Sequence, residues 1–113
     1  MGCEISVVIA AYNASDLIGD CLRSLERQAT SRRLEAIVVD SSTDGTGNLV
    51  AEAFPNVRLF RFSKRKFPGG ARNVGIAAAR GEIVAFLDAD CRAEEDWLER
   101  IAKAHAEPFP AIG

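Results

Sequence analysis

The sequence predicts an α/β three-layer sandwich, in which a mainly parallel sheet of about four strands carries helices on both faces. Apolar runs rich in Val and Ile alternate strictly with segments whose apolar residues recur at helical spacing. Polar residues are concentrated after these runs, as expected of strands that are buried on both faces. With 113 residues, the chain is long enough for one domain, which we place at 1–113.

The first half of the chain contains two expected strands and the helix that joins them. The first strand is Ile5–Ala11, a continuous apolar run. Asn13 or Ser15 is the expected N-cap of the helix that follows. The apolar stripe of this helix consists of Leu17, Ile18, Cys21, Leu22 and Leu25. The second strand is Ala36–Val39, which stops at Asp40, and residues 41–45 are predicted to form a polar turn.

A second helix is expected from about Thr46 to Phe54, because apolar residues recur along it at helical spacing. Val57–Phe62 then alternates in polarity, which is typical of a strand with two unlike faces near the edge of a sheet. The segment 63–70 is predicted to be a basic loop that ends in a Pro-Gly-Gly turn.

The last part of the chain predicts a short Ala-rich helix, a fourth buried strand and a final helix. The Ala-rich helix spans Ala71–Ala79, the strand Ile83–Leu87 and the final helix Ala93–Ala106. The side chains of the final helix that should point inward are Trp97, Leu98, Ile101 and Ala102. Strands separated by helices imply parallel pairing with right-handed crossovers.

The composition excludes several classes of function. A formal net charge of -2 leaves no basic excess to neutralise a nucleic-acid backbone, so we expect no nucleic-acid partner. No apolar run is long enough to span a bilayer. The three cysteines, Cys3, Cys21 and Cys91, are odd in number and widely spaced, which favours free thiols over a disulfide framework or a zinc site. Free thiols suit a reducing compartment, so we expect a cytoplasmic protein.

Polar residues gather where the expected strands end. The first strand ends in Ala11 and is followed by Tyr12 and Asn13, the second ends at Asp40, and Asp88-Ala89-Asp90 follows the fourth. Ligands of open parallel sheets bind outside the carboxyl ends of the strands. The sequence therefore predicts a binding site along this edge.

Asp88 and Asp90 are the most informative pair at this edge. Two carboxylates with one residue between them repel each other, and a bound hard cation offsets this electrostatic repulsion. Mg²⁺ or Mn²⁺ takes oxygen ligands and bridges to substrate phosphates through one or two protein carboxylates. The alternative is a solvated turn with two acids, one of which caps the final helix.

A second cluster precedes the Ala-rich helix. Gly69 and Gly70 allow close approach of the backbone to a ligand, and Arg72 offers a rigid fork of donors for a phosphate. The alternative is a glycine turn beside a surface arginine. The basic triplet at 64–66 is either a solvated loop or a further contact for a diphosphate. Tyr12 could stack on a base, or could be a half-buried aromatic residue.

Four blocks of sequence combine these features in order along the chain. They read ISVVIAAYN at 5–13, IVVDSSTDGT at 37–46, GARNVGIAAARG at 70–81 and IVAFLDAD at 83–90. Together they resemble the inverting glycosyltransferases of family 2, which have the GT-A fold. The resemblance covers almost the whole chain and corresponds to the nucleotide-sugar-binding half of such an enzyme.

The resemblance implies a role for each matching residue. Asp40 would read the nucleotide base, Arg72 would lie near the diphosphate, and Asp90 would bind a divalent cation, Mg²⁺ or Mn²⁺. Asp88 would contact the ribose or the metal. The other expected contacts of the donor are Ala11, Tyr12, Asn13 and Ala89. The cation and Arg72 would stabilise the leaving nucleotide diphosphate, while an acceptor hydroxyl attacks the anomeric carbon and inverts it.

The sequence departs from the family pattern after the second strand, where only Asp40 precedes two serines although the family has paired acids. The sequence consequently does not predict the base, the sugar or the acceptor. The family's general base lies in a later, acceptor-binding segment, expected beyond Gly113, so we expect this chain alone to be inactive. An open side of the sheet should expose apolar side chains and favour a homodimer. Peripheral association of the parent enzyme with the inner face of the membrane also stays open.

Three other classes of protein are alternatives to this interpretation. A non-catalytic nucleotide-binding or interaction module of the same fold is the main alternative, because the expected general base is missing. A dinucleotide-dependent enzyme is disfavoured, since no G-x-G-x-x-G motif follows the first strand. A nucleotidyltransferase would need a phosphate-binding loop near that strand, and residues 10–13 do not form one.

Overall fold

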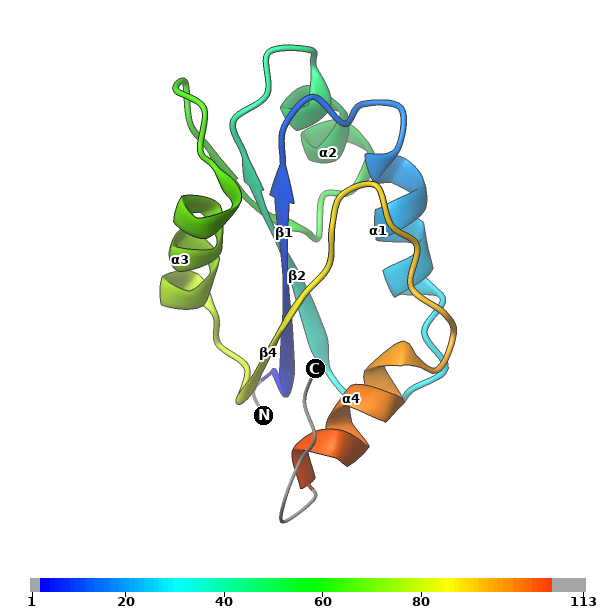
Figure 1. Cartoon of the computed structure of the whole chain (residues 1–113). Helices are drawn as coiled ribbons and strands as arrows, with labels where there is room; N and C mark the ends of the chain where they lie inside the picture. The colour runs from blue at the N-terminus through cyan, green and yellow to red at the C-terminus, as the bar shows by residue number, and fades with distance from the viewer. Residues whose placement is uncertain (1–2, 107–113) are drawn as a thin grey trace.

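The computed structural model describes residues 3–106, and strands and helices alternate along it as the sequence predicts (Figure 1). The strands are β1 (Ile5–Ala11), β2 (Leu34–Asp40), β3 (Arg58–Arg61) and β4 (Ile83–Phe86). The helices are α1 (Ile18–Glu26), α2 (Thr46–Ala53), α3 (Pro68–Ala78) and α4 (Trp97–Ala106). None of the helices in this part of the chain has the length and apolar character that crossing a membrane requires.

The strands form one sheet in the order β3-β2-β1-β4, and every neighbouring pair is parallel. The chain moves outward from β1 through β2 to β3 and then crosses to the other side of β1 for β4. This reversal lies between β1 and β4. In open parallel sheets, a ligand binds at such a reversal, beyond the carboxyl ends of the strands.

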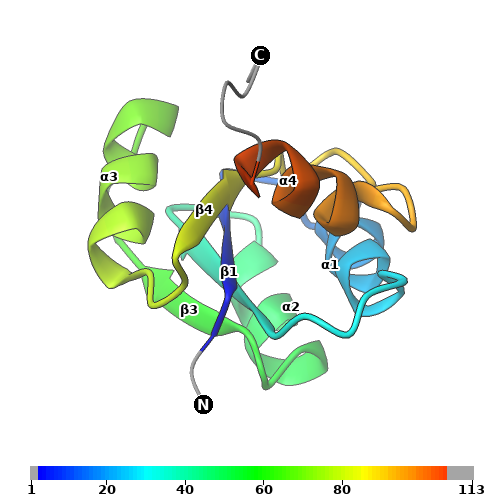
Figure 2. The same ribbon diagram turned by 90° about the horizontal axis from the view of Figure 1, so that it is seen from below.

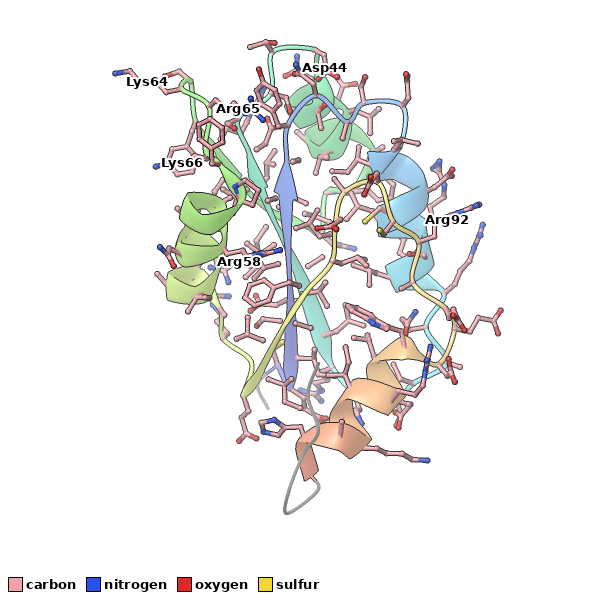
Figure 3. The ribbon with its side chains drawn as sticks, viewed as in Figure 1. Asp44, Arg58, Lys64, Arg65, Lys66 and Arg92 are labelled. Carbon is pink, nitrogen blue, oxygen red and sulfur yellow. The ribbon has the colours of Figure 1, made fainter. Side chains whose placement is uncertain are left out.

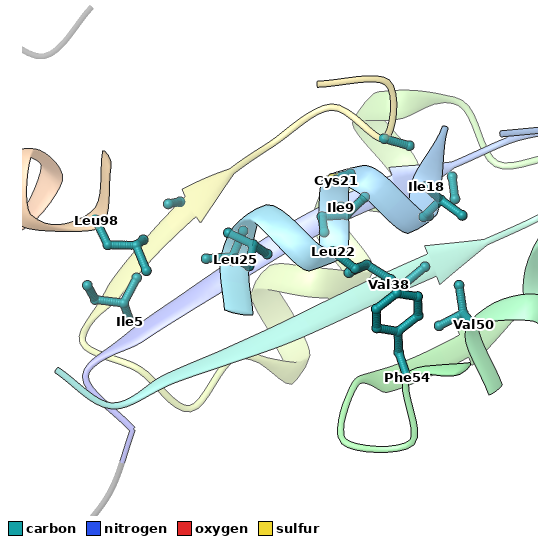
Figure 4. Close-up of a cluster of buried hydrophobic side chains, with 14 residues drawn as sticks. Ile5, Ile9, Ile18, Cys21, Leu22, Leu25, Val38, Val50, Phe54 and Leu98 are labelled. Carbon is teal, nitrogen blue, oxygen red and sulfur yellow. The ribbon is translucent and has the colours of Figure 1, made fainter. Parts of the chain in front are cut away.

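Helices cover both faces of the sheet, which confirms the predicted three-layer α/β arrangement. α1, α2 and α4 lie on one face, whereas α3 lies on the other (Figures 1 and 2). The larger core lies between the sheet and helices α1, α2 and α4 (Figure 4). Its side chains include Ile5, Ile9, Val38, Ile18, Leu22, Leu25, Val50 and Leu98. Each such side chain contributes about 1.5–3 kcal/mol when it is fully removed from water.

The smaller core lies between the sheet and α3. Ile37 and Val39 of β2 and Ala71 of α3 are buried there. β3 contributes to both cores, because Leu59 packs into the larger one and Phe60 into the smaller one. These contacts confirm the prediction of an edge strand with two unlike faces.

α3 packs closely on β1 through Gly75. A Cβ atom at this position would overlap the side chain of Val8, whereas a Cβ at Gly69, in the first turn of the same helix, meets open space.

We expect Gly75→Ala to push α3 from the sheet and to lower the free energy of unfolding by about 1–3 kcal/mol, the usual cost of overpacking. Urea unfolding measures the change. Gly69→Ala is the control and should leave stability unchanged or slightly higher, and equal losses in both variants would contradict the close-packing explanation.

Three helices, α1, α3 and α4, begin at other residues than the sequence predicts. α3 starts at Pro68, so the expected Pro-Gly-Gly turn is its first turn. Proline suits the first helical position, because its fixed φ is helical and no partner is needed for its nitrogen. α1 starts at Ile18, and no side chain caps it. Asn13 and Ser15, the expected caps, instead bond to residues 42–44 of the neighbouring turn.

α4 begins at Trp97, four residues later than expected, because contacts with the segment after α1 hold the preceding residues in a non-helical conformation. The side-chain amide of Gln28 donates to the carbonyl oxygen of Glu94 at 2.6 Å and accepts from the amide of Leu98 at 2.9 Å. The amide of Ala29 donates to the carbonyl of Glu95 at 2.7 Å. A side chain distant in sequence therefore caps this helix.

β4 ends at Phe86 and lies at an edge of the sheet, so the prediction of a fully buried strand at Ile83–Leu87 is wrong. Ile83 and Val84 are half-buried, and Phe86 is 41% exposed. The physical reason is that no other described strand pairs with the outer side of β4. The expected homodimer stays a prediction.

A polar network joins the amino ends of the strands to the end of α3. The Ser6 hydroxyl donates to Glu35 at 2.6 Å, and the Arg58 guanidinium donates to the same carboxylate at 2.8 Å. The amide of Arg80 donates to Glu35 at 2.8 Å, and that of Gly81 donates to the Ser6 hydroxyl, also at 2.8 Å. The guanidinium of Arg58 also donates to the carbonyl of Ala78 (2.7 Å). Glu35 thus connects three strands with the segment that leads into β4.

Candidate functional site

A cavity of about 360 Å³ lies at the carboxyl ends of β1 and β4, where the strand order reverses. Its walls come from these two strands, from α3 and from the loops that follow the strands. The lining residues are Val8, Ala10, Tyr12, Asn13, Ala14, Leu17, Pro68, Arg72, Phe86, Leu87, Asp88, Ala89 and Asp90. All site residues predicted from the sequence except Ala11 and Asp40 are among them.

One wall of the cavity carries the two carboxylates that follow β4. The carbonyl oxygen of Asp88 accepts hydrogen bonds from the amide of Cys91 at 2.9 Å and from the thiol of Cys21 at 3.5 Å. Ala89 is buried against the larger core. This tight turn leaves the side chains of Asp88 and Asp90 exposed at the cavity.

The donor set of this wall fits a hard divalent cation. One oxygen each of Asp88 and Asp90 and the sulfur of Cys91 lie within 4.8 Å of one another. Within residues 3–106, no lysine or arginine forms an ion pair with either carboxylate. Loss of hydration, and then the neighbouring Asp90 and Asp88, raise the pKa of the Cys91 thiol above its ordinary value of 9.0. The two carboxylates offer oxygen atoms, which are the ligands that Mg²⁺ and Mn²⁺ prefer.

The opposite wall is basic. Arg72 lies in α3 and lines the cavity, and its guanidinium carbon is 5.3 Å from the centre of the Phe86 ring. This side chain is not paired with any acid of the described part of the chain. A guanidinium without a carboxylate partner can donate to a phosphate group in a bidentate manner.

The third wall follows β1. Tyr12 is 39% exposed, and the guanidinium of Arg65 lies over its ring, 4.0 Å from the ring centre. Asn13 has a left-handed backbone conformation with φ 51°. Its side-chain oxygen accepts from the amide of Thr43 at 2.8 Å, and its own amide donates to the Ser42 hydroxyl at 2.8 Å. Asn13 thereby fixes the loop after β1 to the turn after β2.

Asp44 strengthens the same connection, although its sequence position predicts only a turn residue. Asp44 lies at the upper end of the molecule in Figure 3. Its carboxylate accepts from the amide and the hydroxyl of Thr46 and from the amide of Ser15. The hydrogen bond from the Thr46 hydroxyl is the largest cause that lowers the pKa of Asp44 from 3.8 to about 2. The available signal was an acid two residues before a threonine at the start of a helix, since such side chains bond to nearby amides.

Asp40 and Ala11 lie outside the lining of the cavity. Asp40 is only 3% exposed, and one carboxylate oxygen accepts from the amide of Ser42 at 3.2 Å. Its other oxygen lies 4.0 Å from Nε of Arg61, and the start of α2 covers it at Gly47. Ala11 is buried in β1. The role of Asp40 in reading a base stays a prediction.

Comparison with known sequences finds a family and several similar proteins. The sequence model described as Glycosyl transferase family 2 matches residues 6–113. The succinoglycan biosynthesis protein ExoO of Rhizobium meliloti (strain 1021) is 40% identical over 99 residues, which cover 87% of this chain and 28% of that protein. The glycosyltransferase AglE of Haloferax volcanii is 36% identical over 101 residues, or 85% of this chain and 33% of that protein. The chain thus spans about a third or less of the length of these relatives.

Solved structures with the same arrangement also include glycosyltransferases. The mannosyltransferase PcManGT from Pyrobaculum calidifontis, in complex with GDP-Man and Mn²⁺, matches with a TM-score of 0.81 and 35% identity. This match covers 93% of the present chain and 33% of that chain. TarS 1-349 of S. aureus, in complex with UDP-GlcNAc, matches with a TM-score of 0.81 and 31% identity over 89% of the present chain and 30% of that chain.

Proposed function

The chain belongs to glycosyl transferase family 2, and we propose that it forms the nucleotide-sugar-binding part of an enzyme that transfers a sugar to an acceptor hydroxyl with inversion and with the help of a metal. The observation that carries this proposal is the cavity between β1 and β4. It has two unpaired carboxylates on one wall and an unpaired arginine on the other. A nucleotide diphosphate and a divalent cation together complement these charges.

The charges of the cavity suggest how the donor is held. We propose that Asp88 and Asp90 hold a divalent cation, Mg²⁺ or Mn²⁺, and that Arg72 donates to the diphosphate from the opposite wall. When bound, such a cation acts as a Lewis acid for the leaving diphosphate. The Mn²⁺ and GDP-Man named for the structurally similar mannosyltransferase support this assignment. Arg72 contributes to the same electrostatic stabilisation, because it is fixed in α3 before the donor binds.

The end of β1 is the proposed position of the nucleoside. Tyr12 offers an exposed aromatic ring, and Ala89 and Asn13 shape the floor and the side of the cavity. The proposed contact between Asp40 and the base requires a shift of the covering residues, because the side chain of Arg61 and the start of α2 lie over the carboxylate.

The remaining parts of the reaction are proposed to come from outside this chain. An acceptor hydroxyl needs a general base, and Asp88 and Asp90 are the only carboxylates among the described residues that line the cavity. We therefore propose that the base follows Gly113 and that the chain alone does not turn over. The same observation favours the second candidate, a module of this fold that binds nucleotides without catalysis. Cytoplasmic location, a homodimer and peripheral association of the parent enzyme with a membrane remain part of the proposal.

Calorimetric titration tests the donor site directly. The 113-residue chain is titrated with UDP, GDP and dTDP, each with and without Mn²⁺, and with the corresponding nucleosides as controls. We expect one diphosphate to bind in an Mn²⁺-dependent manner and its nucleoside to bind far more weakly. Equal affinity for a diphosphate and its nucleoside, or no effect of Mn²⁺, would contradict the proposed site.

A further inference from the structure

Arg65 forms an unusual contact at the rim of the cavity. Its guanidinium carbon lies 4.0 Å from the centre of the Tyr12 ring and 4.5 Å from the centre of the Phe67 ring. Both distances are well inside the range of about 6 Å for cation–π contacts. Phe67 is 63% exposed, so this arrangement does not bury the arginine in a core. The two rings instead hold an exposed cation in one place.

The loop that carries Arg65 is fixed to the sheet close to the cavity. The amide of Lys66 donates to the Ser41 hydroxyl at 2.8 Å, just beyond the end of β2. Phe67 immediately precedes Pro68, which lines the cavity, and Tyr12 lines it as well. Figure 3 shows Arg65 and its two lysine neighbours in the connection from β3 to α3. Arg65 is thus held between Tyr12, which lines the cavity, and Phe67, which is next to a lining residue.

The charge of Arg65 has no acidic partner in the described part of the chain. Stacking on aromatic rings occupies the faces of a guanidinium and leaves its N–H groups, which lie in the plane, free to donate. Such a group is oriented before any ligand arrives, so little side-chain entropy is lost when it binds an anion. Phosphate groups match the planar fork of these donors.

We propose that Arg65, stacked against Tyr12 and Phe67, is a second phosphate-binding residue that holds the diphosphate of the nucleotide donor from the rim of the cavity. Arg72 and Arg65 then contact the diphosphate from two elements, α3 and the loop before it. One face of Tyr12 is already taken by Arg65, so a base can stack only on the other face. This inference rests on the proposed donor site and selects Arg65 from the basic triplet at 64–66, for which the sequence left a solvated loop and a diphosphate contact as alternatives.

Three variants test the role of Arg65. Arg65→Gln removes both the charge and the planar set of guanidinium donors, whereas Arg65→Lys keeps only the charge. Arg80→Gln is the matched control. Arg80 is an exposed arginine at the opposite end of the sheet, and its hydrogen bond to Glu35 uses only the backbone amide. Each variant is titrated with UDP, GDP and dTDP in Mn²⁺, and with inorganic pyrophosphate in metal-free buffer. Thermal unfolding confirms that all variants fold like the original chain.

We expect Arg65→Gln to weaken diphosphate and pyrophosphate binding by about ten- to a hundredfold, the effect of one lost charge-assisted hydrogen bond. Arg65→Lys should recover only part of the affinity, because an ammonium group lacks the planar fork. Arg80→Gln should bind like the original chain.

The outcomes separate this inference from the proposed function. If a nucleoside diphosphate binds and Arg65→Gln binds it as tightly as Arg80→Gln, or more tightly, the inference is overturned and the donor site stands. If pyrophosphate binds in an Arg65-dependent manner but no nucleoside diphosphate binds better, the phosphate-binding role of Arg65 is supported and the donor site is overturned. Absence of binding to every probe overturns both.

Discussion

Replacing Asp90 with asparagine is expected to abolish the effect of Mn²⁺ on nucleoside diphosphate binding. Asp90 is exposed at the cavity, has no lysine or arginine partner among residues 3–106, and lies close enough to Asp88 to share a cation. Asparagine keeps the shape and removes the charge that the cation requires. The loss of Mn²⁺-dependent affinity should exceed the roughly 10- to 100-fold effect of losing a residue that only supports a metal ligand. Calorimetry with and without Mn²⁺ gives the ratio of the two affinities for each variant.

Asp96→Asn is the matched control for this change. Asp96 is an exposed aspartate just before α4, and its ion pair with Arg100, at 3.2 Å, lies on the surface. Asp96→Asn removes one negative charge as well, but it should leave the effect of Mn²⁺ on nucleoside diphosphate binding unchanged. If Asp90→Asn remains as sensitive to Mn²⁺ as the control, Asp90 is not a metal ligand. Asp88→Asn then shows whether the neighbouring acid binds the cation alone.

Replacing Glu35 with alanine is expected to lower the free energy of unfolding by about 2 kcal/mol, within the range of about 1–3 kcal/mol for leaving partly buried hydrogen-bond donors without their partner. The side chain of Glu35 is only 13% exposed, and its removal leaves Arg58, Ser6 and the amide of Arg80 without their acceptor. Urea unfolding followed by circular dichroism measures the loss. Glu82→Ala, a change at an exposed glutamate, should alter stability by less than about 0.5 kcal/mol. Similar losses in the two variants would contradict the importance of the network.

The contribution of Glu35 should also depend on pH. Burial by itself raises the pKa of Glu35, but hydrogen bonds from Ser6, the Arg80 amide and Arg58, with the charge of Arg58, lower it below the ordinary 4.5. A pKa lowered by folding means that the contribution is fully present above pH 4.5 and is lost as the pH falls through the folded pKa. The difference in unfolding free energy between the original chain and Glu35→Ala should therefore shrink in acid. A constant difference would show that the charge of Glu35 is not responsible.

The strands and the edge at which the site lies could be predicted from the sequence, because they depend on local patterns. Val and Ile runs such as Ile5–Ala11 mark strands buried on both faces, and helical segments between them require parallel pairing. Parallel strands bring their carboxyl ends to one edge, which places Tyr12 and Asp88 beside the same cavity. The structural matches to glycosyltransferases confirm the expected GT-A fold.

The ends of several elements could not be predicted in this way. α4 starts where the side chain of Gln28 caps it, and Asn13 is used to fix a neighbouring turn and not to cap α1. In both cases a hydrogen-bond partner far away in the sequence decides between two local conformations of similar energy. Propensity and spacing contain no information on such a partner.

The sequence by itself determined the α/β class, the number of strands and the residues that gather at their carboxyl ends, since burial and periodicity are properties of each segment. Only the tertiary structure decided that β4 pairs with β1, that Asp40 lies under α2 outside the cavity, and that Arg65 stacks on Tyr12 and Phe67. These features depend on contacts between segments distant along the chain. Such contacts are selected by the packing of the whole domain, which no local pattern specifies.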